Sequence, residues 1–403
     1  MALESFYRTH KYLVERAVSP VERRLMNEID RSHRLIGIKG VRGVGKTTFL
    51  LQYAKEHFGT DDRSCLYINF NNFYFTAHTL VEFAEEFYAQ GGRTLLIDQM
   101  FKCENWSKQL RECYDRFPEL HIVFIGSTVM RLIEDNDDLK DIVSVYNLRG
   151  FSFREFLFLQ TGKKLPILTL TQIIHHHEEI AREICSQISP LDFFQEYLHH
   201  GYYPFFLEQR NFSENLLKKM NLTIGIDVLV IKQIELKYLA KVRKLLYLLM
   251  VNSPATPNVS QLSKEIKISR ATIMNYMKYL QDARLLNLLY SEDNVFPKKP
   301  DLVYAHNTNL MHVINRDTSA SLSASNVDKT AERKTFLYNM LNVNHKVNIS
   351  LNNVDFLIDK QLRFSYVEKS QNGKNNSNIV YAVDDIVIGE GNEVPLWLFG
   401  LLY

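Results

Sequence analysis

The chain has 403 residues, enough for about two to four domains of roughly 100–200 residues each. A hydrophobic content of 46% and a charged content of 23% are typical of a globular protein, and a net charge of +2 excludes a globally basic nucleic-acid coat protein. Four cysteines without C-x-x-C spacing predict neither disulfides nor a zinc site. The first residues are charged and no apolar run is long enough for a membrane span, so we expect a cytoplasmic protein without membrane contact.

A phosphate-binding motif lies near the N-terminus. Residues 1–33 are expected to be largely helical, and they lead into a short apolar strand at 35–38. Residues 40–47 then match G-x-x-x-x-G-K-[ST] at every position, and a helix is expected at 48–57. Because a strand, a glycine-rich loop and a helix follow one another as this motif requires, a chance glycine-rich turn is a poor alternative.

The chemistry of the motif follows from its backbone. Glycines let successive N–H groups point at phosphates, and the helix N-terminus adds its positive end. Lys46 would bridge the β- and γ-phosphates of ATP, and the Thr47 hydroxyl would hold Mg²⁺. We therefore expect ATP to be bound by Gly40, Val41, Arg42, Gly43, Val44, Gly45, Lys46, Thr47 and Thr48.

Further along the chain, strands alternate with helices. A strand is expected at 64–70, a helix at 79–89, and a second apolar strand at 94–98 that ends in Asp98. A carboxylate at the end of a buried strand can reach the Mg²⁺ shell, and its place about fifty residues after the loop strengthens that interpretation. The expected metal ligands are therefore Thr47 and Asp98.

The next strand is also expected to end in polar side chains. A helix at 106–115 precedes a buried strand at 121–128, which ends in Ser127 and Thr128. Ser127 would sense the γ-phosphate or position water, or the two hydroxyls would cap a following helix; both interpretations stay open. Continuous apolar strands that alternate with helices indicate a three-layer α/β core with a parallel sheet.

The second half of the chain has a different character. An aromatic-rich, mostly helical stretch runs from about 150 to 235, followed by a predicted winged helix. Its expected helices are 259–266 and 270–283, and strands 285–290 and 302–305 would form the wing. Residues 240–300 hold ten Lys or Arg against four acids, a net +6 that suits a DNA backbone. The side chains expected to face a DNA groove are Arg270, Thr272, Asn275 and Lys278; the alternative is a packing or protein-contact module.

Beyond a polar linker at 316–330, a last part of the chain combines a helix with strands at 354–358 and 362–368. With it, the chain resembles the bacterial and archaeal AAA-type ATPases that carry a winged helix and a C-terminal domain of PD-(D/E)xK nuclease-like type. Its ending, 395–403, resembles members from gut bacteroidetes. The stretches that carry the resemblance are 40–47, the strand that ends at Asp98, 125–127, 151–156 and 201–204.

The resemblance implies a P-loop ATPase core at 1–160, a helical lid at 161–238, a winged helix at 239–305 and a small α+β nuclease-like domain at 306–403. It also implies ATP and Mg²⁺ as cofactors and admits a homo-oligomer. In such an assembly an arginine reaches a neighbouring γ-phosphate. The candidates here are Arg149, Arg154 and Arg131, of which Arg154 lies in the most family-like stretch, although a salt bridge within the chain is equally open for it.

Gln99 departs from the family pattern, in which a glutamate that activates water follows the metal-binding aspartate. An amide can orient water but cannot take its proton, so hydrolysis should be slow while ATP and Mg²⁺ still bind. The expected catalytic set is thus Lys46, Asp98, Gln99, Ser127 and Arg154. Whether Gln99 is natural or was introduced to trap the ATP-bound state stays open.

The nuclease-like part departs from its pattern too. Glu332 and Asp355 match the expected helix and strand positions, but Glu368 and Lys369 are adjacent where an acid-x-lysine spacing is needed. Neighbouring strand residues face opposite sides, so a degenerate site is predicted. The leading functional hypothesis is an ATP-driven switch or motor acting on DNA or a partner protein. A DNA-binding regulator with a nucleotide-gated core comes second, and a metal-dependent nuclease third.

Overall fold

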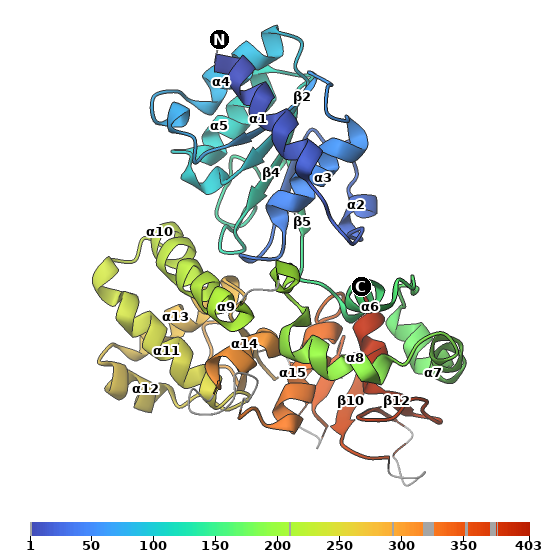
Figure 1. The fold of residues 1–403 in the computed structure, drawn as a ribbon. Helices are drawn as coiled ribbons and strands as arrows, with labels where there is room; N and C mark the ends of the chain where they lie inside the picture. Colours follow the sequence, from blue (N-terminus) through green and yellow to red (C-terminus); the bar gives the residue numbers. More distant parts are fainter. Residues whose placement is uncertain are drawn as a thin grey trace. The chain divides into compact units, whose positions relative to one another are not determined.

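The computed structural model describes residues 2–208, 211–291, 294–316, 326–350, 354–370, 376 and 378–403 (Figure 1). Contacts within the chain divide it into two compact units, Met1–Arg149 and Gly150–Tyr403. In the described part of the chain, no helix combines the length and the apolar character that crossing a bilayer requires. The boundaries of the four domains expected from the sequence remain predictions.

A five-stranded parallel sheet forms the centre of the first unit. Its strands, in the order β2-β3-β4-β1-β5, are β1 (Leu35–Lys39), β2 (Cys65–Asn69), β3 (Thr94–Asp98), β4 (His121–Gly126) and β5 (Val143–Asn147). The first four are almost wholly buried, which explains their continuous apolar sequences. The parallel α/β core predicted from the sequence is confirmed.

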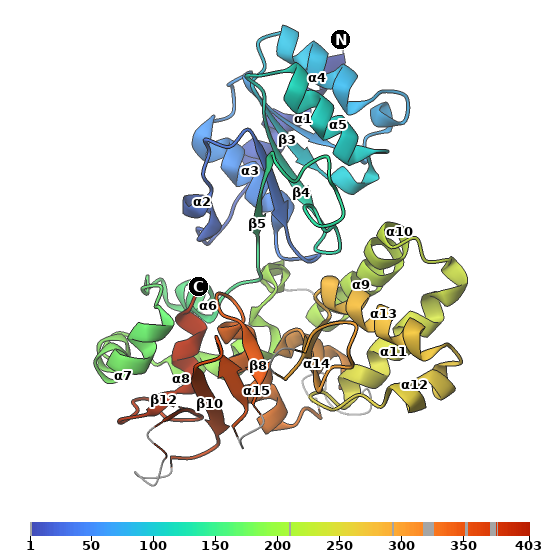
Figure 2. The same cartoon turned by 180° about the vertical axis from the view of Figure 1, so that it is seen from behind.

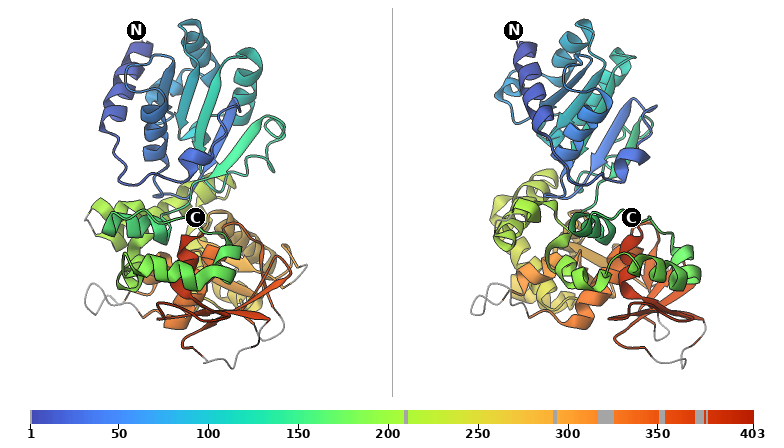
Figure 3. Two further views of the ribbon diagram at one scale, coloured as in Figure 1. Left: turned by 90° about the vertical axis from the view of Figure 1, so that its right-hand side faces the viewer. Right: turned by 45° about the vertical axis from the view of Figure 1, so that its right-hand side comes forward.

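Helices cover both faces of this sheet. They are α1 (Ala2–Arg16), α2 (Leu25–Glu28), α3 (Lys46–His57), α4 (Leu80–Ala89) and α5 (Trp106–Arg116), with short 3₁₀ turns at Phe73–Thr76 and Met100–Lys102. Helices α1 and α3 lie on one face and α4 and α5 on the other (Figures 2 and 3), as right-handed crossovers between parallel strands require. The N-terminal stretch is less helical than expected, because only α1 and α2 form within 1–33.

The strand order decides where polar side chains meet. Strand β4 lies between β1 and β3, with Lys39 opposite Gly126 and Ile97 opposite Phe124. The carboxyl ends of these three strands therefore lie side by side at one edge of the sheet. The phosphate loop leaves β1 there, Asp98 ends β3, and Ser127 follows β4. One sheet edge thus carries the phosphate loop, Asp98, Gln99 and Ser127, whereas Arg154 lies in the second unit.

The second unit begins with α6 (Phe153–Thr161), whose N-terminus is closed by a capping box between Ser152 and Glu155. The following elements are α7 (Leu170–Cys185), α8 (Pro190–Glu196), a π-helical turn η3 (Tyr197–Gly201), a 3₁₀ turn (Pro204–Glu208), α9 (Phe212–Leu222), a π-helical turn η5 (Thr223–Val228) and α10 (Leu229–Ile231). This agrees with the helical character expected for 150–235.

A helical group with a two-stranded sheet comes next. It contains a 3₁₀ turn (Leu236–Tyr238), α11 (Leu239–Val251), α12 (Val259–Ile266), α13 (Arg270–Asp282), β6 (Leu286–Leu289), β7 (Leu302–Ala305) and α14 (Thr308–Ile314). Ser269 caps α13, and β6 pairs antiparallel with β7, as the sequence suggested. The individual elements are therefore confirmed, whereas their assignment to a winged helix stays a prediction.

A mixed sheet completes the second unit. Helix α15 (Lys329–Leu341) precedes five strands, which are β8 (Val347–Ile349), β9 (Phe356–Ile358), β10 (Leu362–Val367), β11 (Ile379–Val383) and β12 (Glu393–Pro395). In the sheet these strands lie in the order β12-β11-β10-β9-β8. A 3₁₀ stretch, η7 (Leu396–Leu401), follows β12. One hydrophobic core joins α6 and α8 to α15 and η7 through Phe153, Phe194, Phe336 and Trp397. Most of the expected linker, with its serines at 319, 321, 323 and 325, lies outside the described residues.

Candidate nucleotide-binding site

The phosphate loop has the backbone that its glycines predict. Gly43 and Gly45 have φ of 92° and 90°, in the left-handed region that residues with a Cβ avoid. Gly45 ends the loop, and α3 begins at Lys46, two residues before the expected start. Gly40 is required for a different reason: a Cβ there would lie 2.7 Å from the carbonyl oxygen of Leu148.

Lys46 lies across the loop. Its Nζ donates hydrogen bonds to the carbonyl oxygens of Gly40, at 2.7 Å, and Val41, at 2.9 Å. The ammonium group is therefore held at the loop that would receive the phosphates, because two carbonyls of that loop accept its protons. Thr48 follows at the exposed start of α3.

Asp98 is the buried carboxylate of the site, with 1% of its surface exposed. Its Oδ2 accepts hydrogen bonds from the Thr47 hydroxyl, at 2.7 Å, and from the Tyr67 hydroxyl, at 3.0 Å. Its Oδ1 is buried and has no hydrogen-bond partner among the described residues. A buried carboxylate oxygen without a donor is costly, and a hard divalent cation would satisfy it. Thr47 and Asp98 therefore fit a Mg²⁺ site.

Gln99 directly follows this carboxylate. Its side chain is half-buried, and its backbone is left-handed, with φ of 59°. Non-glycine residues in this region are uncommon and gather at functional sites. The side chain is an amide, so it can orient a water molecule without accepting its proton.

Ser127 lies beyond the end of β4. Its Oγ accepts a hydrogen bond from the backbone N–H of Val129 at 3.3 Å, and it is buried together with Thr128. No helix begins in the turn that follows, so the proposal that these hydroxyls cap one is wrong. A role toward the γ-phosphate stays a prediction.

Arg23 was not predicted from the sequence. One guanidinium nitrogen, Nη1, donates to the carbonyl oxygen of Val44 at 3.1 Å, and the other, Nη2, to that of Arg149 at 2.6 Å. The side chain thus joins the phosphate loop to the last residue of the first unit. No motif marks this arginine, because the acceptors on Val44 and Arg149 are backbone atoms, which any residue supplies.

Arg154, the candidate for action in a neighbouring subunit, belongs to the second unit, in α6. Its Nε donates to the carbonyl oxygen of Tyr403 at 3.2 Å. This contact lies within the chain, as the alternative interpretation expected.

The four side chains expected to contact DNA differ in their availability on α13. Arg270 and Asn275 are exposed, and Thr272 is half-buried beside Ser269, whose Oγ lies 2.8 Å from the Thr272 hydroxyl. Lys278 forms an ion pair with Asp282 at 2.7 Å. The exposed pair, Arg270 and Asn275, is therefore the better placed for an external partner.

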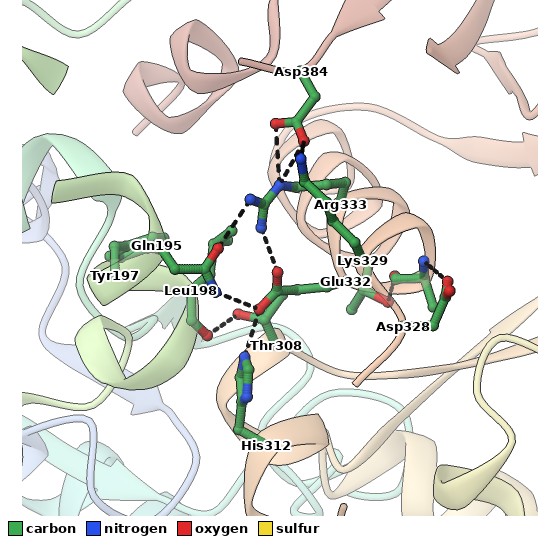
Figure 4. Close-up of polar contacts among 12 residues, drawn as sticks. Gln195, Tyr197, Leu198, Thr308, His312, Asp328, Lys329, Glu332, Arg333 and Asp384 are labelled. Carbon is green, nitrogen blue, oxygen red and sulfur yellow. Dashed lines mark hydrogen bonds and ion pairs between the residues drawn. The ribbon is translucent and has the colours of Figure 1, made fainter. Parts of the chain in front are cut away.

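Glu332 and Asp355 of the nuclease-like part have different partners, and Figure 4 shows those of Glu332. Glu332 is buried and contacts His312, Arg333 and Gln195, whereas Asp355 pairs with Lys334 at 2.5 Å. Glu368 and Lys369 are exposed and lie beyond the end of β10, so the expected strand at 362–368 is one residue too long. In the described ranges, no three His, Cys, Asp or Glu side chains are arranged to hold a metal ion.

Arg333 occupies the centre of this buried network. Its Nε donates to both carboxylate oxygens of Asp384 at 3.1 Å, and its Nη2 donates to Gln195 at 2.9 Å (Figure 4). Lys329 pairs with Asp384 at 3.1 Å. The carboxylate of Glu332 is therefore balanced by side chains of the protein itself, which is the arrangement of a structural network.

Comparison with known proteins agrees with the geometry of the first unit. Residues 32–157 match the family model of the AAA domain, and residues 191–306 match a domain of unknown function, DUF8612. Two uncharacterized proteins of Methanocaldococcus jannaschii are similar: MJ1637, 26% identical over 270 residues, and MJ1544, 26% identical over 311 residues. These alignments cover 64% and 74% of this chain but only 56% and 65% of the relatives.

Among solved structures, ORC1 of Aeropyrum pernix in complex with DNA is 10% identical with a TM-score of 0.30, covering 78% of this chain and 92% of that one. AMPPCP-bound DnaA from Aquifex aeolicus is 14% identical with a TM-score of 0.27, covering 68% and 87%. Similarity this low supports no conclusion about function. The family match, the parallel sheet and the phosphate loop agree with one another, and residues 32–157 of this chain are therefore similar to the AAA domain.

Proposed function

We propose that this protein is an AAA-type ATP-binding switch that hydrolyses ATP slowly. The observation that supports it best is the pairing of Thr47 with Asp98, which leaves Asp98 Oδ1 buried and without a donor beside the phosphate loop. A protein that used this fold only as a scaffold would not need a buried carboxylate oxygen without a donor, because burying an apolar side chain at this position would cost less free energy.

The residues divide the work as follows. The N–H groups of residues 40–47 and the N-terminus of α3 bind the phosphates, and Lys46 moves from the loop carbonyls to them. Thr47 and Asp98 would hold Mg²⁺, which would neutralise phosphate charge when bound. Gln99 orients water without deprotonating it, so the ATP-bound state persists. A long-lived bound state suits a switch better than a motor.

The experiment is a titration of the full chain with a fluorescent ATP analogue, with and without Mg²⁺. We expect Lys46→Ala to abolish binding or weaken it by more than about tenfold, since the loss of a hydrogen bond to a charged group costs about 1.5–3 kcal/mol. Asp98→Asn should remove most of the gain that Mg²⁺ gives. Lys108→Ala, an exposed lysine on α5, is the matched control. Equal binding by all four chains would refute the proposal.

A second candidate function is binding of DNA by the second unit. The exposed Arg270 and Asn275 on α13, together with the net +6 of residues 240–300, favour it. The test is fluorescence anisotropy of a DNA duplex at several salt concentrations, with Arg270→Ala against Lys108→Ala. Binding that weakens with salt and with Arg270→Ala alone supports the candidate; binding that is unchanged by Arg270→Ala contradicts it.

A further inference from the structure

A line of hydrogen bonds leads to Asp98 from the neighbouring strand. The backbone N–H of Asn71 donates to Asn69 Oδ1 at 2.8 Å, Asn69 Nδ2 donates to the Tyr67 hydroxyl at 3.2 Å, and that hydroxyl lies 3.0 Å from Asp98 Oδ2. Tyr67 and Asn69 both belong to β2, which pairs with β3 so that Asn69 is opposite Asp98.

The direction of these bonds is fixed at one end. A backbone N–H can only donate, so the Asn71 contact assigns the oxygen and nitrogen of the Asn69 amide. The amide nitrogen must then donate to the Tyr67 oxygen, and the single proton of that hydroxyl is left for Asp98.

Tyr67 itself is firmly held. Only 4% of its surface is exposed, and its backbone N–H donates to Nδ1 of the buried His10 on α1 at 2.9 Å. The ring and the hydroxyl therefore have little freedom to follow Asp98 if that carboxylate turns. A rigid donor on Oδ2 restricts the rotation of the carboxylate and keeps Oδ1 as the oxygen left over for a ligand.

We propose that Tyr67 is a positioning residue for the cation of the nucleotide site, acting by holding the Asp98 carboxylate with Oδ1 free. This inference rests on the proposed function and deepens it, because it names a side chain outside the phosphate loop that tunes the metal. The Thr47 hydroxyl donates to the same oxygen, Oδ2, so Thr47 and Tyr67 together occupy it and leave Oδ1 for the cation.

The test is the affinity for Mn²⁺, measured by electron paramagnetic resonance on the full chain loaded with a non-hydrolysable ATP analogue. We expect Tyr67→Phe to weaken Mn²⁺ binding about tenfold, equivalent to about 1.4 kcal/mol, the loss of one hydrogen bond to a charged group. Binding of the analogue in EDTA should not change. A role in stability alone would leave the Mn²⁺ affinity of the folded protein as it is.

Tyr53→Phe is the matched control, because Tyr53 is equally buried, in α3, with its ring against His57. It should leave the Mn²⁺ affinity unchanged. If Tyr67→Phe does not fold, Asn69→Ala removes the donor that directs the Tyr67 proton and should weaken Mn²⁺ binding in the same sense. Unchanged or tighter Mn²⁺ binding in the folded variant overturns the inference alone. A wild-type chain that binds the analogue but no Mn²⁺ overturns it too, and one that binds neither also refutes the proposed function.

Discussion

The hydroxyl of Thr47 donates a 2.7 Å hydrogen bond to the carboxylate of Asp98, although 51 residues separate them in the chain. The sheet order brings them together, because β4 is the only strand between the one that precedes the phosphate loop and the one that ends in Asp98. The consequences of this site for activity and stability can be measured one residue at a time.

Replacing Gln99 by glutamate should speed ATP hydrolysis. The variant restores a carboxylate beside Asp98, and a general base contributes about 10²–10⁴-fold, so we expect at least a tenfold rise in steady-state turnover. Lys46→Ala provides the blank. Equal turnover of wild type and Gln99→Glu, both above the blank, would mean that another group positions the water and that Gln99 is not a disabled base.

Gly40→Ala should impair the phosphate loop. The added methyl group would lie 2.7 Å from the Leu148 carbonyl oxygen, which is backbone and cannot turn aside. We expect nucleotide affinity to fall and the free energy of unfolding of the first unit to drop by about 1–3 kcal/mol. Gly225→Ala is the control, since nothing lies within 4 Å of a Cβ there. Similar losses at both glycines would contradict this explanation.

Arg23→Ala should weaken nucleotide binding indirectly, because Arg23 supports the phosphate loop and is not expected to contact the phosphates itself. It removes the donors to the carbonyls of Val44 and Arg149, so the loop loses a support outside the motif. We expect roughly a tenfold loss of affinity in the ATP-analogue titration. Arg24→Ala, which removes a surface ion pair with Glu28, should have little effect. An affinity in Arg23→Ala equal to that in Arg24→Ala would count against this role.

Arg333→Ala should strongly destabilise the second unit. Arg333 is 4% exposed and balances the buried carboxylates of Glu332 and Asp384, so its loss leaves charge buried without a partner. We expect about 3–5 kcal/mol in urea unfolding. Arg182→Ala breaks an exposed pair with Glu178 on α7 and should cost about 0–1 kcal/mol. Comparable midpoints for both variants would refute the structural role of the network.

Stability should fall as the medium becomes acidic. Burial, then the neighbouring His312 and His200, lowers the pKa of His199 to about 4 from 6.5. Below about pH 6.5 His199 is protonated in the unfolded chain but stays neutral in the folded chain. The folded state therefore loses stability as the pH falls from about 6.5 to 4, and its stability does not depend on His199 above that range. His199→Gln should flatten the decline of Tm with pH, whereas His175→Gln, an exposed residue, should not. Parallel declines in the two variants would disprove the assignment.

Local chemistry explains which features could be predicted from sequence. The glycines, lysine and threonine of the loop at 40–47 and the aspartate that ends a buried strand, Asp98, form a pattern that is specific to phosphate binding. The buried strands could be predicted because they are continuous apolar runs. Strand β5, Val143–Asn147, was not anticipated, because it lies at the sheet edge, where its half-exposed residues carry no such run. Tyr67 and Arg23 escaped notice for a related reason: their roles depend on contacts made only once distant strands and loops meet.

The C-terminal part shows the opposite case. Glu332 was found by its position on a helix, but its neighbours His312, Gln195 and Arg333 come from other elements or carry no motif, so their neutralising contacts could not be read from spacing. The degenerate nuclease-like site inferred from the adjacent Glu368 and Lys369 stays a prediction. The sequence could not indicate that the Glu332 carboxylate belongs to a buried structural network.

The Arg23 contact with Arg149 has one more consequence. Residue 149 is the last of the first unit, and the peptide that follows it opens the second. A single guanidinium therefore contacts both the phosphate loop and the residue that directly precedes the second unit in the chain. If nucleotide binding shifts the Val44 peptide, the Arg23 side chain links that shift to the backbone at residue 149, and a change in amide hydrogen exchange at Phe151 on ATP binding would detect its spread along the chain.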